Sequence, residues 1–393
     1  MKNSISKLTG LALLSVLAFT TSCSSDDDSN GGSHTSTFEV IQDNLKGTIT
    51  DGNAILEAGK TYKLTGKLQV NDGASLTIEA GARIEATDVT SSTPEIRYIA
   101  VSQGGKIFVQ GTSSNPVVMT ADTKEPGAWG GVVICGKAPI NKGTSASAEV
   151  SDLTYGGADT PENRADSSGS IKYLRIEYSG YAYNSEKEFN GLSLFGVGSG
   201  TTIEYVQSYE GSDDAFEWFG GTVNAKYLVA INTNPNSVGD DIFDWTEGWT
   251  GTGEYWYGKR SNGGNRGIEA DNNSSNHAAT PISNPTIKNL TLVGSGSSIG
   301  GEDQAIKLRV GTKGSFDNVV ISNWTRGFDV QDTPDLSAGY VGNELKATNV
   351  RFENVTELTN STAEGIYTEN PSATGAGNGT AKPTWAEGWT VGF

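Results

Sequence analysis

Short segments of alternating apolar and polar residues recur along the chain and share one six-residue pattern. Apolar residues take the first, fourth and sixth positions in most copies, and this alternation predicts β-strands. The copies occupy residues 171–176, 203–208, 225–230, 287–292, 316–321 and 347–352. Their starts are 32, 22, 62, 29 and 31 residues apart. Most intervals suit one coil of a solenoid, and the interval of 62 suits either two coils or one large insertion.

The third position of this pattern changes once along the chain, from Tyr to Asn. It reads Tyr173, Tyr205, Tyr227, Asn289, Asn318 and Asn349. Parallel in-register strands place equivalent side chains about 4.8 Å apart, where rings stack and amides form ladders. The strands of a sandwich alternate in direction and would not stack identical residues. The sequence therefore predicts a parallel β-helix.

A second, shorter pattern follows the first in each coil. It occupies residues 192–194, 216–218, 243–245, 306–308 and 328–330, with 268–270 standing alone inside the long interval. The outer apolar residues are expected to face the core, and the middle residue to point outward. Stacking would then line up the middle residues as one outward column, formed by Ser193, Glu217, Asp244, Glu269, Lys307 and Asp329.

Composition and local sequence support the same fold. The chain has 51 glycines among its 393 residues, and short apolar runs separated by turn residues are typical of an all-β protein. Residues 73–81, 111–120 and 129–141 resemble the recurring sequences of bacterial right-handed parallel β-helix surface lipoproteins of the Bacteroidota type. The resemblance runs from about residue 45 to the C-terminus. It implies an all-β, pectate-lyase-like solenoid, and it says almost nothing about activity because this family is largely without assigned function.

The first residues of the chain predict export. Lys2 and Lys7 precede an apolar run at 11–19, and small residues then lead into Cys23. This arrangement resembles a bacterial lipoprotein signal, so we expect 1–22 to be a signal peptide and Cys23 to carry lipid. A cleaved signal or a membrane anchor is the alternative, but the run is well short of the ~20 residues that a spanning helix needs.

The rest of the chain divides into a tether and one domain. Residues 23–38 are polar and acidic, which predicts a flexible tether, and 24–28 resemble the acidic export tag of surface lipoproteins. We expect a single β-helix domain at 39–393, in which 358–384 form a long polar loop. Residues 385–393 are expected to cap the last coil, because an open solenoid end exposes its core. The predicted location is the outer membrane, lipid-anchored and exposed at the cell surface.

Charge and cysteine content narrow the set of partners. The formal net charge is -18, which argues against nucleic acid, since phosphate binding needs a basic face. Divalent cations or cationic groups suit such a chain better. Cys135 is the only cysteine besides Cys23, so a lipidated chain has no intrachain disulfide. Cys135 lies in an apolar run and is expected to be buried filler.

The outward column suggests a metal site. Successive carboxylates about 4.8 Å apart repel one another unless a cation or a proton lies between them. Calcium takes several oxygen ligands in flexible geometry and fits this arrangement. The alternative is a solvated acidic face with ion pairs to Lys307, Arg309 and Arg266. The candidate calcium ligands are Glu217, Asp244, Glu269, Asp213 and Asp240.

Aromatic residues suggest a polysaccharide site. Trp249, Trp256 and Tyr257 lie in a Gly-rich stretch that we interpret as a loop, and rings exposed beside carboxylates suit sugar faces and hydroxyls. Trp218 and Trp245 are expected to fill the core instead. The candidate ligand-binding residues are Trp249, Trp256, Tyr257, Asp241, Lys307 and Arg309.

Three classes of function remain open. The favoured one is a non-catalytic surface module that binds glycan or another envelope component, including an envelope protein, or acts in adhesion. A polysaccharide lyase or hydrolase using the acidic flank is the second, with Lys307 or Arg309 as base. The chain has only His34 and His277, so the Gly-His-Gly element of β-helix polygalacturonases is absent. The third is a purely structural surface protein.

Overall fold

The computed structural model describes residues 34–393 except 185–186, 235–238, 262–263, 297–302 and 333–334. The predicted signal peptide at 1–22, the lipid site Cys23 and residues 23–33 of the tether lie outside the described residues. Within the described part, no helix is long and apolar enough to cross a membrane.

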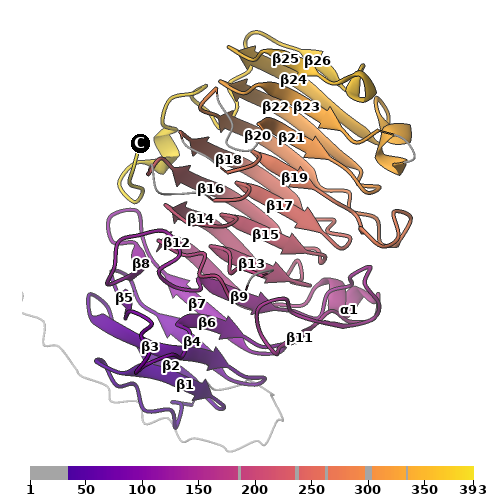
Figure 1. Ribbon diagram of the computed structural model, residues 1–393. Helices are drawn as coiled ribbons and strands as arrows, with labels where there is room; N and C mark the ends of the chain where they lie inside the picture. The colour runs from indigo at the N-terminus through magenta and orange to yellow at the C-terminus, as the bar shows by residue number, and fades with distance from the viewer. Residues whose placement is uncertain (1–33, 185–186, 235–238, 262–263, 297–302, 333–334) are drawn as a thin grey trace, which may run out of the picture. The chain divides into compact units, whose positions relative to one another are not determined.

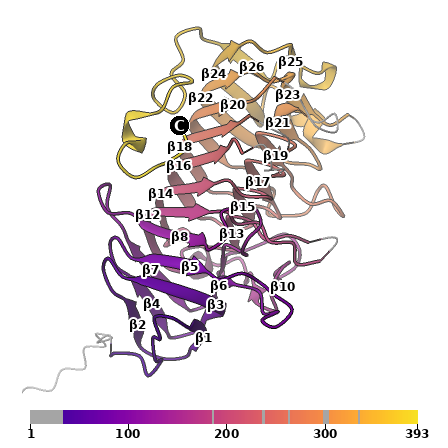
Figure 2. The same cartoon turned by 60° about the vertical axis from the view of Figure 1, so that its left-hand side comes forward.

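The chain winds as a right-handed parallel β-helix whose coils stack along one axis (Figures 1 and 2). One ladder begins with β1 (Leu45–Ile49) and the second half of β3 (Thr61–Val70) and carries one short strand from each later coil. We call it the first ladder. Its later members are β6 (Tyr98–Val101), β9 (Val132–Cys135), β13 (Leu192–Phe195), β15 (Phe216–Phe219), β17 (Phe243–Thr246), β19 (Ile268–Ala270), β21 (Gln304–Leu308), β23 (Arg326–Val330) and β25 (Glu357–Thr359).

The other two sides of the helix start as separate strands and then merge. The separate strands are β2 (Asn53–Leu56), β4 (Ser75–Ile78) and β7 (Lys106–Gln110) on one side, and β5 (Arg83–Ala86) and β8 (Val117–Ala121) on the other. From β12 onward one long strand supplies both sides, because the first half of β12 pairs with β7 and its second half with β8. The long strands are β12 (Gly169–Glu177), β14 (Thr202–Tyr209), β16 (Asn224–Asn232), β18 (Thr252–Arg260), β20 (Thr286–Val293), β22 (Gly314–Ser322), β24 (Leu345–Glu353) and the short β26 (Tyr367–Glu369).

The ladder of Tyr and Asn residues forms the corner inside each long strand. Tyr173 has φ +51° and Asn289 has φ +59°, in the left-handed region that Asn tolerates better than most residues. The Tyr rings stack, with centroids 4.3 Å apart for Tyr173 and Tyr205 and 4.4 Å for Tyr205 and Tyr227. The predicted ladder is confirmed. Its Tyr residues adopt a left-handed backbone conformation that is rare for Tyr, and their rings stack on one another.

The long interval of 62 residues contains two coils. Strand β18 pairs with β16 on one side and β20 on the other, and Tyr255 stacks on Tyr227 at 5.0 Å. Its coil had no recognisable copy of the six-residue pattern because Gly253 replaces the apolar first residue. A Cβ at Gly253 would lie 2.4 Å from the ring of Trp256, so the indole fills the space that this side chain would take.

The C-terminal residues depart from the predicted loop and cap. Residues 358–384 include β26, which pairs in parallel with β24, and the short 3-10 helix at Ser361–Ala363. Beyond β26, residues 370–393 run back along the Tyr and Asn ladder, and we call them the return segment. Trp389 packs edge-on against Tyr173 and Tyr205, with centroids 5.8 and 6.0 Å apart. The prediction that residues 385–393 cap the last coil is therefore wrong, because Trp389 covers the Tyr ladder of earlier coils instead.

The remaining described elements lie outside the coils. A two-stranded antiparallel hairpin joins β10 (Ala146–Ser147) and β11 (Thr154–Tyr155), and α1 (Pro161–Arg164) follows it. Short 3-10 helices occupy Leu336–Tyr340 and Thr384–Ala386. Cys135 is fully buried in β9, and burial raises the pKa of its thiol to about 12, so its predicted role as core filler is confirmed.

Candidate functional site

The outward column exists as the sequence predicts. Ser193 pairs with Glu217, Glu217 with Asp244 and Asp244 with Glu269 in successive strands of the first ladder. The register continues from Glu269 to Lys307 and from Lys307 to Asp329. Because the flanking residues of each strand are buried in the core, the middle residues lie on the outer face.

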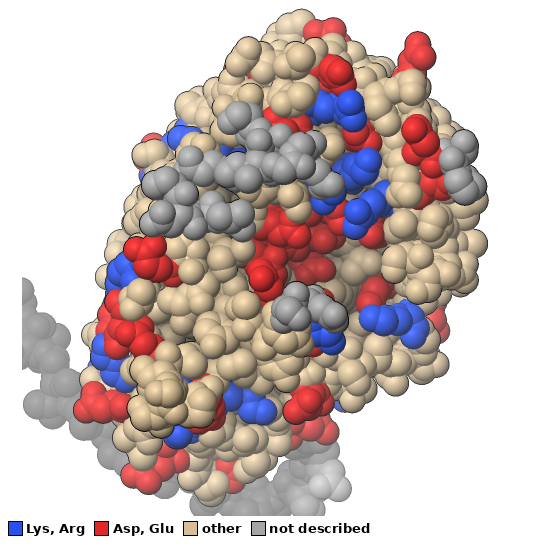
Figure 3. All heavy atoms as spheres, viewed as in Figure 1, with Lys and Arg blue, Asp and Glu red and all other residues tan. Residues whose placement is uncertain are grey.

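Loops next to these strands add further carboxylates. The segments that follow β14 and precede β17 bring two pairs of aspartates to the column, and three overlapping groups then place carboxylate oxygens within 4.8 Å of one another. Figure 3 shows acidic side chains gathered in a depression near the middle of this face. We call this set the acidic cluster, which consists of Asp213, Asp214, Glu217, Asp240, Asp241, Asp244 and Glu269.

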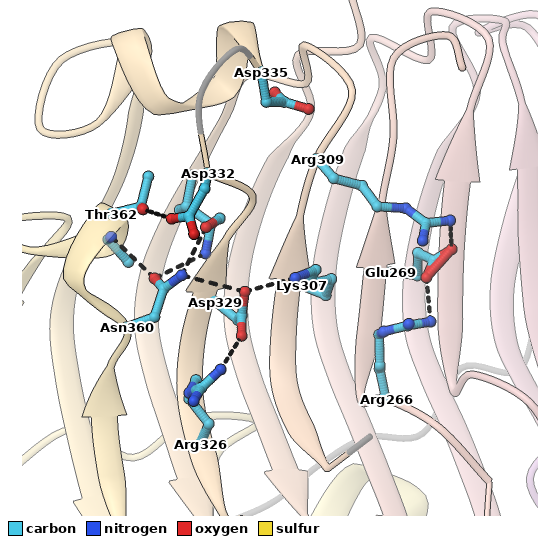
Figure 4. Close-up of polar contacts among 12 residues, drawn as sticks. Arg266, Glu269, Lys307, Arg309, Arg326, Asp329, Asp332, Asp335, Asn360 and Thr362 are labelled. Carbon is cyan, nitrogen blue, oxygen red and sulfur yellow. Dashed lines mark hydrogen bonds and ion pairs between the residues drawn. The ribbon is translucent and has the colours of Figure 1, made fainter. Parts of the chain in front are cut away.

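Basic residues neutralise one end of the acidic cluster. Arg266 and Arg309 both bind the carboxylate of Glu269, as Figure 4 shows. Arg266 also lies 3.5 Å from an oxygen of Asp241, and Arg309 Nε donates to Asp271 at 2.7 Å. The sequence did not single out Asp271 as a ligand, although it sits two residues after Glu269 and therefore on the same face.

Farther along the column, the described side chains form further ion pairs. Lys307 Nζ lies 2.6 Å from an oxygen of Asp329, and Arg326 binds the other oxygen (Figure 4). Lys307 and Arg309 are thus held by carboxylates of the protein itself. Their predicted role as ligand-binding residues stays a prediction, and the geometry shows a structural role for both.

At the other end of the acidic cluster, Asp213, Asp214, Glu217 and Asp244 form no ion pair with any residue that the structure describes. The nearby guanidinium of Arg260 is buried and donates to the backbone carbonyl of Asp240. Asp214 accepts a hydrogen bond from the backbone N–H of Asp241 at 2.7 Å, and Glu217 accepts one from the Asn190 amide at 2.5 Å. Asp244 Oδ1 is fully buried and accepts no hydrogen bond within the described part of the chain. A buried carboxylate oxygen without a donor is costly, so a cation or a proton is expected beside it.

Electrostatics agree with this geometry. Burial, together with repulsion from neighbouring carboxylates, raises the pKa values of Asp214, Glu217 and Asp244 well above their ordinary range. The same causes raise the pKa of Asp213 to about 8. For Glu269 burial raises the pKa to about 7 although Arg309 and Arg266 oppose the shift. These shifted carboxyls therefore keep their protons to higher pH than free carboxyls do, unless another positive charge replaces the protons.

The aromatic residues predicted to contact a ligand do not reach solvent. Trp249 and Trp256 are completely buried and Tyr257 is 1% exposed. Trp256 and Tyr257 lie in strand β18 instead of a loop, and Trp218 stacks on both Trp249 and Trp256, at 4.8 and 4.9 Å. The predicted binding role of these three residues is wrong, because Trp249 and Trp256 fill the solenoid core, while Tyr257 is covered by the return segment and donates to the carbonyl of Thr380 at 2.8 Å.

Comparisons with known proteins agree with this architecture. A family model described as a pectate-lyase-like beta helix domain matches residues 47–390, so the chain belongs to that family. No curated protein and no solved structure is significantly similar to the chain. The family establishes the fold and leaves the ligand and any reaction open, so the lipid anchor and the surface location remain predictions.

Proposed function

We propose that the protein is a non-catalytic surface module whose acidic cluster binds calcium and, through it, an extended glycan. The buried Oδ1 of Asp244, which lacks a hydrogen bond donor in the described chain, carries this proposal. Asp244 belongs to one group of close carboxylates with Asp214 and Glu217 and to a second group with Asp241 and Glu269. Calcium accepts six to eight oxygen ligands at about 2.3–2.6 Å, so carboxylates together with ligand hydroxyls or water can complete its shell.

The location of the cluster suits a chain-like ligand. It lies on the outer face of a continuous strand ladder, and successive coils repeat about every 4.8 Å along the axis. Such a face offers equivalent positions to successive units of an extended partner. A cation bound at the surface leaves ligand positions open, and sugar hydroxyls or carboxylates can occupy them.

The catalytic alternative has less support. A lyase needs a free base near the cation, but Arg309 is bound to Glu269 and Asp271 and Lys307 to Asp329. A purely structural role fits the long ladder and remains the reference against which binding is tested. Adhesion through a protein of the envelope would use the same exposed face.

A polysaccharide panel separates these functions. Full-length protein immobilised from detergent is incubated with neutral and acidic polysaccharides in calcium or in EDTA, and both retention and product release are scored. We expect retention that requires calcium, with no shortening of the polymer. Release of unsaturated or reducing products would identify an enzyme, and equal retention of every polymer in EDTA would contradict the cation-dependent module.

A further inference from the structure

A separate cavity of about 290 Å³ lies between the first ladder and the hairpin of β10 and β11. Phe195 and Phe219 form one wall, with their rings stacked 4.0 Å apart and nearly parallel. Tyr155 packs edge-on against Phe195 at 5.0 Å. Phe219 follows Glu217 by two residues in β15, so both side chains lie on the outer face and the cavity adjoins the acidic cluster. We call it the Tyr155 pocket.

Polar groups surround this aromatic wall. The buried carboxylate of Glu247 accepts a hydrogen bond from the Tyr155 hydroxyl at 2.5 Å and pairs with Lys142 Nζ at 3.0 Å. Lys187 donates to the backbone carbonyl of Glu149 at 3.2 Å. The side-chain carboxyl of Glu149 accepts no hydrogen bond from any residue that the structure describes, although it lines the cavity. The carboxyl group of Glu149 can therefore form hydrogen bonds with a ligand.

We propose that the Tyr155 pocket binds one uncharged, hydroxyl-rich pyranose ring of a glycan. Two ammonium groups face two carboxyl groups here, so the lining has no excess of either sign and does not select a phosphate, a uronate or a cationic amine. Hydroxyls satisfy both kinds of group, because each donates one hydrogen bond and accepts others. Phe195 and Phe219 are only 1% and 5% exposed, so hydrogen bonds to the polar groups, and not stacking on the rings, are expected to hold the sugar.

The volume of the cavity also restricts the ligand to one sugar ring. About 290 Å³ is at the lower end of the range for small-molecule sites, so one ring fits and a longer segment must continue outside. This subsite rests on the proposed glycan-binding function, but its own groups need no cation, because both lysines already lie beside the two carboxyl side chains. Calcium removal therefore leaves the pocket intact.

Saturation-transfer NMR on the full-length protein in detergent and EDTA tests the subsite. The probes are glucose, galactose, mannose and N-acetylglucosamine, with glucuronate and glucosamine as charged comparisons. We expect saturation of at least one neutral sugar and a weaker signal from its charged counterparts. Substituting Lys142→Met together with Glu149→Gln should weaken that binding at least tenfold. The matched control is Lys172→Met with Glu204→Gln, which makes the same two substitutions at an ion pair of 3.0 Å on another side of the helix and should change nothing.

Three outcomes would overturn the subsite: no neutral sugar is saturated, the signal is the same in the pocket variant, or only charged sugars bind. Polysaccharide retention in calcium with no sugar binding in EDTA would support the acidic cluster and reject the pocket. Monosaccharide binding that is lost in the pocket variant, without any calcium-dependent retention, would support the pocket and reject the role of the cluster.

Discussion

Asp244 is the residue at which sequence and structure agree most closely on a site. Its position follows from the two-residue alternation of a strand, which puts it between Glu217 and Glu269 on the outer face. The column was predictable because it depends on register alone. Its ion pairing was not, because Arg266 and Arg309 reach Glu269 through side-chain conformations that no spacing specifies.

Removing charge from the unpaired end should abolish the effect of calcium. Calcium that binds only the folded protein raises its stability by mass action, so the wild-type melting temperature should rise with calcium concentration. Glu217→Gln combined with Asp244→Asn should remove most of that rise, as measured by differential scanning calorimetry. Glu344→Gln, far from the cluster in a pair with Lys313, serves as the control. A wild type that does not respond to calcium would leave only a protonated acidic face.

The carboxyls with raised pKa values, among them Asp213 and Glu269, should make the free energy of unfolding depend on pH. The direction is opposite to that of ordinary acid denaturation. Their pKa values are raised in the folded protein, so the folded state keeps protons that the unfolded chain releases near pH 4. The free energy of unfolding should therefore fall as pH rises from about 4 towards 8, the pKa of Asp213. Urea unfolding in EDTA at several pH values measures this decline.

Calcium provides the control for that pH dependence. Because the ion replaces protons on the same oxygens, it should restore stability at pH 8 and have little effect at pH 5. An increase in stability between pH 5 and pH 8 in EDTA would show that the cluster is ionised and stabilised by the protein alone.

The buried indole of Trp256 in β18 gives a prediction about core packing. Trp256 donates from its ring nitrogen to the carbonyl of Ala225 at 3.1 Å and fills the space above Gly253. Trp256→Ala should cost about 3–5 kcal/mol in the free energy of unfolding, as large-to-small core changes do. Denaturant unfolding measures this loss, with Tyr183→Ala as an exposed control. A nearly unchanged stability would mean that the ring is not part of the core.

At the level of elements, the repeated strands were predictable and the connections between them were not. The ladder from Tyr173 to Asn349 follows from one repeated position, whereas the coil of β18 was hidden because glycine replaces its first apolar residue. The Tyr155 pocket was also missed. Its Phe residues follow Ser193 and Glu217 by two positions, a signal that alternation could have supplied, but the hairpin that closes the pocket has no such periodicity.

The return segment should stabilise the coils that it crosses. Gln207 exchanges two hydrogen bonds with the backbone of Val391, at 2.8 and 3.0 Å, and Trp389 is completely buried against the Tyr ladder. Trp389→Ala should detach residues near the C-terminus and lower the melting temperature. Limited proteolysis followed by mass spectrometry would detect new cleavage after residue 370, with Leu358→Ala as a control at a partly exposed site. Cleavage that remains unchanged would show that other contacts of the segment suffice.

At the scale of the whole molecule, the outward column forms one charged face along successive coils of a strongly acidic protein. Part of the net charge of -18 is paired within the column, and burial raises the pKa of Asp214 in the acidic cluster, which opposes its ionisation. A protein of this sign is repelled by anionic surfaces at low salt, and screening shortens that repulsion to about 10 Å at 0.1 M. Divalent cations can therefore bridge it to anionic polymers.

The predicted position of the molecule in the cell rests on Cys23, which precedes the described β-helix in the chain. We expect Cys23 to be acylated with more than one chain, because a single acyl chain binds a membrane only marginally while two give a stable anchor. Labelled palmitate should be incorporated into the wild type and lost in Cys23→Ala, while Cys135→Ala, which changes the buried cysteine, should retain the label. Protease added to intact cells should degrade the β-helix domain if it faces outward. Degradation only after the outer membrane is opened would place the domain in the periplasm, and the proposed contact with external polysaccharide would then have to be replaced by one with a polymer of the periplasm.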